Sequence, residues 1–80
     1  MTAPPYALLE TARADVGMSI TELWIAYFAL GGVARPEVLR AYLRGWHTGP
    51  FDYDVAAHAV NERYLERGLN HPVPYRDDLI

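Results

Sequence analysis

The stretch SITELWIAYFALGG, residues 19–32, decides the fold. It opens with a capping box, in which the Ser19 hydroxyl accepts from the backbone of Glu22 and the Glu22 carboxylate reaches back to Ser19. The apolar residues that follow have the spacing of one helix face: Ile20, Leu23, Trp24, Tyr27 and Phe28. Gly31 and Gly32 then stop the helix. The pattern predicts a helix from about residue 20 to residue 30.

The other side of this predicted helix is apolar as well. It carries Ile25, Ala26, Ala29 and Leu30. A helix that is apolar nearly all round needs cover nearly all round. In a chain of 80 residues, we therefore expect this helix to be either the central helix of the domain or a helix at an interface with another chain.

Two further helices follow along the chain. Pro36 suits the first position of a helix, and Gly45 stops it. The buried stripe of this helix would be Val38, Leu39, Tyr42, Leu43 and Trp46, with Glu37, Arg40 and Arg44 on the opposite face. The last helix would run from about Tyr53 to Arg67, with Asp52 as its N-cap. Its stripe of small residues predicts close packing against the helix at residues 20–30.

The two ends of the chain are less regular. Residues 1–17 are predicted to be either an extra helix, beginning near Pro4, or a flexible extension. Residues 70–80 are predicted to form an extended, proline-rich tail, because a proline disfavours helix at the residue before it. The expected fold is all-α: one domain over residues 1–80, a small bundle of three main helices to which the N-terminal segment adds a fourth if it is ordered.

Composition excludes several classes of protein. The chain has no cysteine, so it has no disulfide framework and no thiolate zinc site. The N-terminus lacks the features of a signal peptide, and the longest apolar stretch, residues 23–33, is too short to span a membrane. Together these features favour a cytoplasmic protein with no membrane association.

One constellation carries candidate chemistry. Asp54, His58 and Glu62 lie at four-residue steps and share one helix face. Such a column could bind a metal ion or transfer protons, but a single helix face rarely supplies enough converging ligands. We therefore interpret these three residues as a solvated polar face of the helix. The three histidines, His47, His58 and His71, show no ligand spacing. We expect no catalytic residue, metal or cofactor, and hence a protein that is not an enzyme.

The leading functional hypothesis comes from the surplus of apolar and aromatic residues. Half the chain, 51%, is apolar, which is more than a small core needs. Aromatic and arginine side chains anchor protein interfaces. The predicted partner-binding residues are Arg40, Arg44, Trp46, Phe51 and Tyr53. The sequence thus predicts a small regulatory protein–protein interaction module whose partner is either a foreign protein or, in a homodimer, a second copy.

The alternative hypothesis is a DNA-binding transcriptional regulator. The two helices around Gly31 and Gly32 have a helix-turn-helix-like layout, and Arg40 and Arg44 on the second helix could enter the major groove. Glu37 lies on the same face, the net charge is −3, and the chain has no lysine. Phosphate neutralisation drives non-specific DNA affinity, so nucleic-acid binding ranks second.

Overall fold

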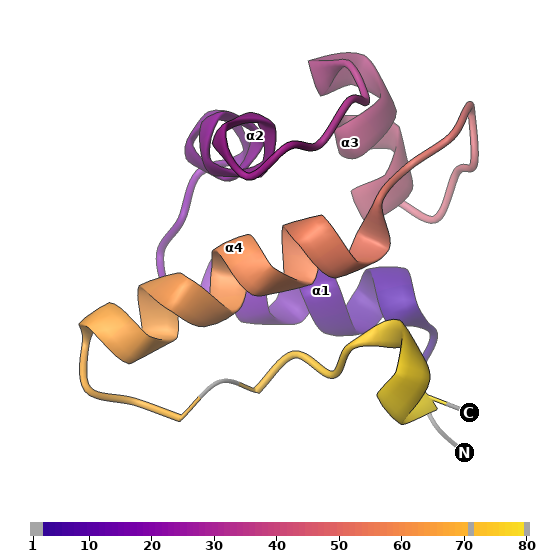
Figure 1. Cartoon of the computed structure of the whole chain (residues 1–80). Coiled ribbons are helices and arrows are strands. Elements are labelled where there is room, and N and C mark those ends of the chain that lie inside the picture. The colour runs from indigo at the N-terminus through magenta and orange to yellow at the C-terminus, as the bar shows by residue number, and fades with distance from the viewer. Residues whose placement is uncertain (1–2, 71, 80) are drawn as a thin grey trace.

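The computed structural model describes residues 3–70 and 72–79. These residues form α1 (Pro5–Asp15), α2 (Ile20–Ala29), α3 (Pro36–Leu43), α4 (Tyr53–Glu66) and a short 3₁₀ helix, η1 (Arg76–Leu79) (Figure 1). The described residues contain no strand, so the all-α prediction is confirmed. None of the helices in this part of the chain combines the length and apolar character that a bilayer crossing requires.

The four α-helices pack in a closed ring. α1 contacts α3 and α4, and α2 also contacts α3 and α4. Figure 1 shows α4 crossing in front of α1, with α2 seen nearly end-on above them. The predicted packing of the last helix against residues 20–30 is confirmed. The N-terminal segment forms α1 and buries Leu9 and Ala12, so four helices build the core.

The ends of α2 follow the sequence signals closely. The Ser19 hydroxyl accepts from the Glu22 backbone N–H at 3.0 Å, and the Glu22 carboxylate accepts from the Ser19 N–H at 2.8 Å. The hydrogen bond from the Ser19 backbone N–H to the Glu22 carboxylate, with a further contribution from the Ser19 side chain, lowers the pKa of Glu22. At the other end, Gly32 donates its N–H to the Tyr27 carbonyl at 2.9 Å. A Cβ at Gly32 would lie 2.3 Å from the Tyr27 ring, so this turn requires glycine.

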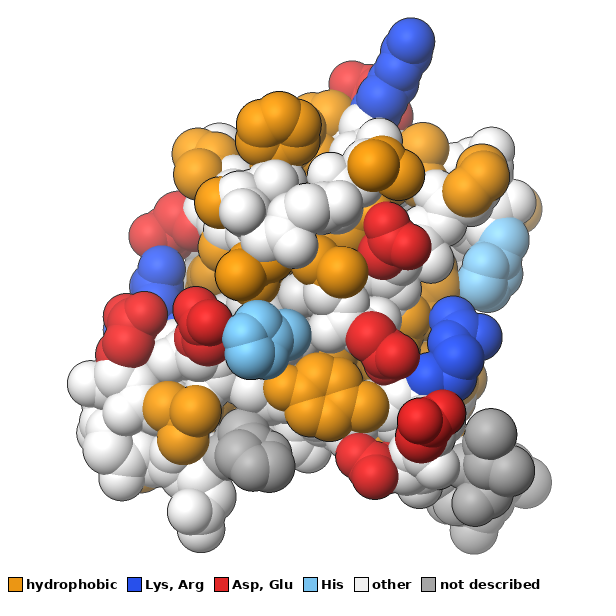
Figure 2. Space-filling view, in the orientation of Figure 1, with side chains coloured by type: hydrophobic (Ala, Val, Ile, Leu, Met, Phe, Trp, Pro, Cys, Tyr) orange, Lys and Arg blue, Asp and Glu red, His pale blue; other side chains and the backbone are white. Residues whose placement is uncertain are grey.

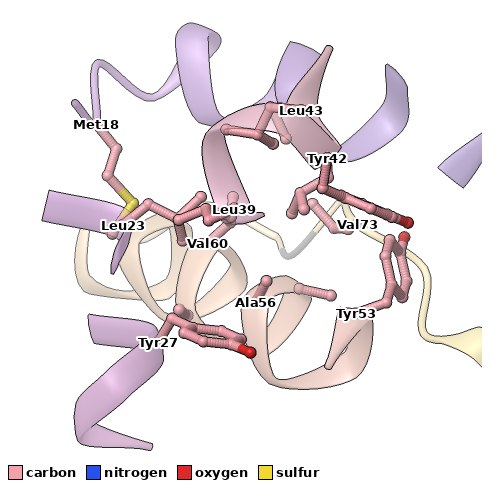
Figure 3. Close-up of a cluster of buried hydrophobic side chains, with 14 of the residues drawn as sticks. Met18, Leu23, Tyr27, Leu39, Tyr42, Leu43, Tyr53, Ala56, Val60 and Val73 are labelled. Carbon is pink, nitrogen blue, oxygen red and sulfur yellow. The ribbon is translucent and has the colours of Figure 1, made fainter. Parts of the chain in front are cut away.

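The core draws most heavily on α4, as Figure 3 shows for part of it. α4 has seven buried residues: Tyr53, Ala56, Ala57, Ala59, Val60, Asn61 and Tyr64. α2 has two, Leu23 and Tyr27. α4 is therefore the more central helix. Of the two alternatives expected for residues 20–30, the central helix of the domain does not hold, and a helix at an interface with another chain stays a prediction. Small side chains let α4 sit deep between its neighbours, whereas the large side chains of α2 fit there on one side only.

The chain after α4 turns back along that helix (Figure 1). The buried Asn61 amide fixes it, donating to the Val73 carbonyl at 2.9 Å and accepting from the Val73 N–H at 3.0 Å. The predicted extended tail over residues 70–80 is not confirmed, because Arg76–Leu79 form η1. Within the predicted tail, His71 and Ile80 lie outside the described residues.

Candidate functional site

The structure divides the five predicted partner-binding residues into two groups. Arg40 and Arg44 are exposed on the outer side of α3, and Trp46 is 68% exposed just beyond its end. Phe51 is partly buried, and Tyr53 is only 2% exposed. We call Arg40, Arg44 and Trp46 the α3 edge. Only this part of the predicted surface is open to a partner.

Tyr53 belongs to the core and the partly buried Phe51 packs against it, so little of either side chain is open to the partner predicted for them. The Phe51 ring stacks on Tyr42 with centroids 4.3 Å apart and on Tyr27 at 5.4 Å. The Tyr53 hydroxyl donates to the Pro74 carbonyl at 2.8 Å. Burial raises the pKa of Tyr53 to about 12. Tyr53 begins a helical stripe that continues through Ala56, Ala57, Val60 and Tyr64; this spacing was the signal that could have identified it as core.

The end of α3 holds the backbone of Trp46 in place. Gly45 adopts a positive φ of 89°, which lets the chain reverse and lets Trp46 donate its N–H to the Ala41 carbonyl at 3.0 Å. Arg40 and Arg44 are one helical turn apart and share a side of the helix. Among the described residues, neither guanidinium forms an ion pair. The α3 edge therefore combines one exposed aromatic ring with two cations for which the described part of the chain supplies no ion-pair partner.

A second exposed surface lies on and just after α2. Its large apolar side chains are exposed by 57% for Ile25, 61% for Phe28, 40% for Leu30 and 80% for Val33. Figure 2 shows apolar side chains gathered at the top of the view, over α2 and α3. The Phe28 ring stacks on Trp24, whose indole N–H donates to the Ala34 carbonyl at 3.0 Å. We call these four exposed side chains the α2 face.

The Asp54, His58 and Glu62 column splits into separate contacts. The Asp54 carboxylate accepts from the backbone N–H of Arg76 at 2.7 Å. His58 lies between the Glu62 carboxylate, at 2.9 Å from Nε2, and the Tyr75 hydroxyl, at 3.1 Å from Nδ1. Acidic and histidine side chains cross the middle of Figure 2 over this helix and the tail. Two members of the column thus contact the returning tail, which explains their presence without any ligand.

The three histidines do not come together in the part of the chain that the structure covers. His47 packs edge-on against Tyr42, with ring centroids 5.2 Å apart, and His58 lies on α4. His71 is outside the described residues. Among the residues described, no group of three or more His, Cys, Asp or Glu side chains is placed to hold a metal ion.

Comparisons with protein families, with curated proteins and with solved structures find no match for this chain. The surfaces of the molecule are therefore the observations that bear on its function. The two that stand out are the α3 edge and the α2 face, both of which lie outside the core described above.

Proposed function

We propose that this protein is a non-enzymatic protein–protein interaction module that docks a partner through the α3 edge. The observation that carries the proposal is the exposure of Trp46, 68%, directly after a helix that presents two guanidinium groups without ion-pair partners among the described residues. Tryptophan and arginine are the side chains that contribute most binding energy in protein interfaces. Covering an exposed indole ring with the apolar surface of a partner also lowers the free energy of the complex.

The chemistry of the α3 edge specifies the kind of partner. Trp46 would fill an apolar groove, and Arg40 and Arg44 would pair with carboxylates on its rim. Arginine binds carboxylates through two parallel hydrogen bonds, which adds geometric specificity to the attraction. The expected partner is therefore a protein with an apolar groove and an acidic rim.

The test compares captures from a nuclease-treated lysate by four tagged proteins of equal concentration. A stoichiometric protein should be retained by the unmodified chain and lost on Trp46→Ala and on the double variant Arg40→Gln/Arg44→Gln. Leu69→Ala is the matched control, because Leu69 is also exposed, at 52%, but lies outside the α3 edge. Circular dichroism should show equal helix content for all four. Equal retention by all four, or no stoichiometric protein, overturns the proposal.

The DNA-binding alternative makes a different prediction for the same variants. Duplex DNA would bind at low salt, and the affinity would fall steeply as salt rises. Arg40→Gln/Arg44→Gln would reduce that binding, while Trp46→Ala would leave it largely intact because phosphate contacts need cations. This pattern, if found with purified protein, replaces the protein partner with a nucleic acid.

The α2 face supports a second candidate role, self-association. Its four members, Ile25, Phe28, Leu30 and Val33, are all uncharged, so a second copy can meet the same surface without placing like charges opposite each other. The largest apolar patch on a typical monomer covers on the order of 300–600 Å² and is often functional. We therefore name a second copy of this chain as the occupant of the α2 face.

Sedimentation equilibrium tests the self-association role. The apparent mass should rise towards twice the chain mass as the concentration increases, and Phe28→Arg should return it to that of a monomer. Leu65→Arg is the control, because Leu65 is 56% exposed on α4 and lies outside the α2 face. A monomeric mass at every concentration rules out a second copy on this surface.

A further inference from the structure

A cavity of about 380 Å³ lies between the start of α1, the end of α3 and η1. The side chains that matter in its lining are Tyr6, Tyr42, His47, Tyr53, Arg76 and Leu79. Its volume is within the range of small-molecule sites, which are mostly apolar and carry a few convergent polar groups. Neither the α3 edge nor the α2 face contributes to this lining, so the cavity is a separate feature of the molecule.

The walls of the cavity are largely aromatic. Figure 3 shows Tyr42 and Tyr53 side by side, with their hydroxyl ends on the same side of the core. Tyr6 closes against the end of α3, because a Cβ at Gly45 would lie only 2.9 Å from its ring. Aromatic walls favour a flat or apolar ligand body, which can pack against the faces of the rings.

The Tyr42 hydroxyl is a polar group that the cavity leaves accessible. Tyr42 is 6% exposed, and its hydroxyl is not a buried atom left without a partner among residues 3–70 and 72–79, so a ligand in the cavity can reach it. The Tyr53 hydroxyl, by contrast, is engaged by the Pro74 carbonyl. A tyrosine hydroxyl keeps its proton at neutral pH, and burial raises the pKa of Tyr42 further, so the hydroxyl can donate a hydrogen bond to a ligand.

The charge of the cavity indicates which ligands it accepts. Arg76 contributes a guanidinium, and no carboxylate belongs to the described residues that line the cavity. The Arg76 backbone is held by Asp54 through a 2.7 Å hydrogen bond, while its guanidinium forms no ion pair with any described residue. Among the described residues of the lining, the guanidinium of Arg76 is therefore the group that brings a full positive charge.

We propose that this cavity binds a small carboxylic acid with a flat, apolar body. The carboxylate would accept from the Arg76 guanidinium and the Tyr42 hydroxyl, and the body would lie among the tyrosine rings. Two charge-assisted donors at one end and aromatic walls around the rest are the features that small-acid sites need. This ligand site is independent of the docking role proposed above.

The test uses benzoate as the probe, with benzamide as its neutral counterpart and acetate as an acid without a ring. Protein-observed NMR should show saturable shifts of the Tyr42 and Tyr53 ring signals with benzoate. Benzamide and acetate should bind at least about tenfold more weakly, which is the factor expected for losing one charge-assisted contact or the apolar body. Benzamide binding as tightly as benzoate, or no saturable shift at all, overturns the proposal.

Two variants assign the contacts to residues. Arg76→Gln, at an exposed position, should raise the benzoate Kd about tenfold and remove the preference over benzamide. Tyr42→Phe keeps the ring and should weaken benzoate severalfold. Arg40→Gln is the matched control, since it removes an exposed arginine of α3 that does not line the cavity. Unchanged benzoate affinity in Arg76→Gln contradicts the proposed site, whatever the effect of Tyr42→Phe on folding.

Discussion

α2 and α4 differ in how their apolar content relates to their burial in the core. α2, ITELWIAYFA, has one charged residue, yet it buries only Leu23 and Tyr27 fully. α4, YDVAAHAVNERYLE, has several charged residues and a histidine, yet it supplies seven buried residues. The more polar helix is therefore the more central one. The position of a helix in this core depends on how small side chains, and polar side chains with hydrogen-bond partners, are distributed along one side of it. It does not depend on the total number of apolar residues.

The difference follows from packing geometry. Alanines at positions 56, 57 and 59 let neighbouring helices come close to α4, and Asn61 is buried because both halves of its amide are hydrogen-bonded. The bulky side chains of α2 fit the core on one side only, and the apolar side chains on its other side contribute to the α2 face. Four changes test this contrast, beginning with the one of largest expected effect.

Leu23→Ala probes the buried side of α2. Leu23 has no exposed surface, and replacing a fully buried leucine with alanine costs about 3 kcal/mol through lost burial and a residual cavity. Denaturant-induced unfolding should show this loss as a lower midpoint with an unchanged slope. A loss below about 1 kcal/mol would mean that α2 is loosely held on both sides, and the contrast with α4 would need a different explanation.

Asn61→Ala probes the polar centre of α4. The change leaves the N–H and carbonyl of Val73 without their partners inside the core, which costs about 2 kcal/mol of unfolding free energy. Leu65→Ala, at an exposed position on the same helix, is the control and should stay within about 0.5 kcal/mol. Hydrogen exchange at Val73 should also accelerate in Asn61→Ala, and an unchanged exchange rate would contradict the role of the amide.

Raising the pH probes the buried start of α4. Burial raises the pKa of Tyr53 from 10.0 to about 12, so the folded protein keeps the proton after the unfolded chain has lost it. Its contribution to stability is complete below pH 10 and is lost as the pH rises towards 12. In an alkaline titration followed by ultraviolet absorbance, one tyrosine should ionise only at the high-pH end, and this step should be absent in Tyr53→Phe. If Tyr53→Phe left the late part of the titration unchanged, burial of this hydroxyl would be refuted.

Phe28→Ala probes the outer side of α2 and has the smallest expected effect. Phe28 is 61% exposed, and a surface substitution of this kind changes the unfolding free energy by no more than about 0.5 kcal/mol. The measurement is made at low protein concentration, where a second copy does not cover the α2 face. A loss close to that of Leu23→Ala would show that this side is covered within the monomer.

The sequence predicted the helices better than their burial. The capping box at Ser19 and Glu22, the stop at Gly31 and Gly32 and the start at Pro36 all appear in the structure, because helix ends depend on local chemistry. The sequence pattern indicates a docking role for Tyr53, whereas the structure buries it in the core. Burial depends on which helices meet, and Val73 and Tyr53 meet their partners through contacts far along the chain, which local patterns do not encode.

The same limit applies to the candidate sites. Arg40 and Arg44 are exposed as their helical spacing indicated, because one amphipathic helix determines both positions. The cavity at Tyr42 and Arg76 could not be anticipated, since it joins residues from α1, α3 and η1. Only the folded arrangement brings a tyrosine of α3 next to an arginine of the tail.

The two described ends of the chain meet at one place, where Pro4 and Leu79 line the same cavity (Figure 1). A mechanical load applied through the two ends would therefore act across that cavity and peel the tail from α4, rather than shear the helices past one another. Beyond η1, such peeling would first meet the hydrogen bonds of Tyr75 with His58 and of Pro74 with Tyr53, and then the Asn61 amide on Val73. A ligand bound between α3 and η1 would add contacts between these two elements. In single-molecule pulling, the force at the first rupture should then be higher with the ligand than without it.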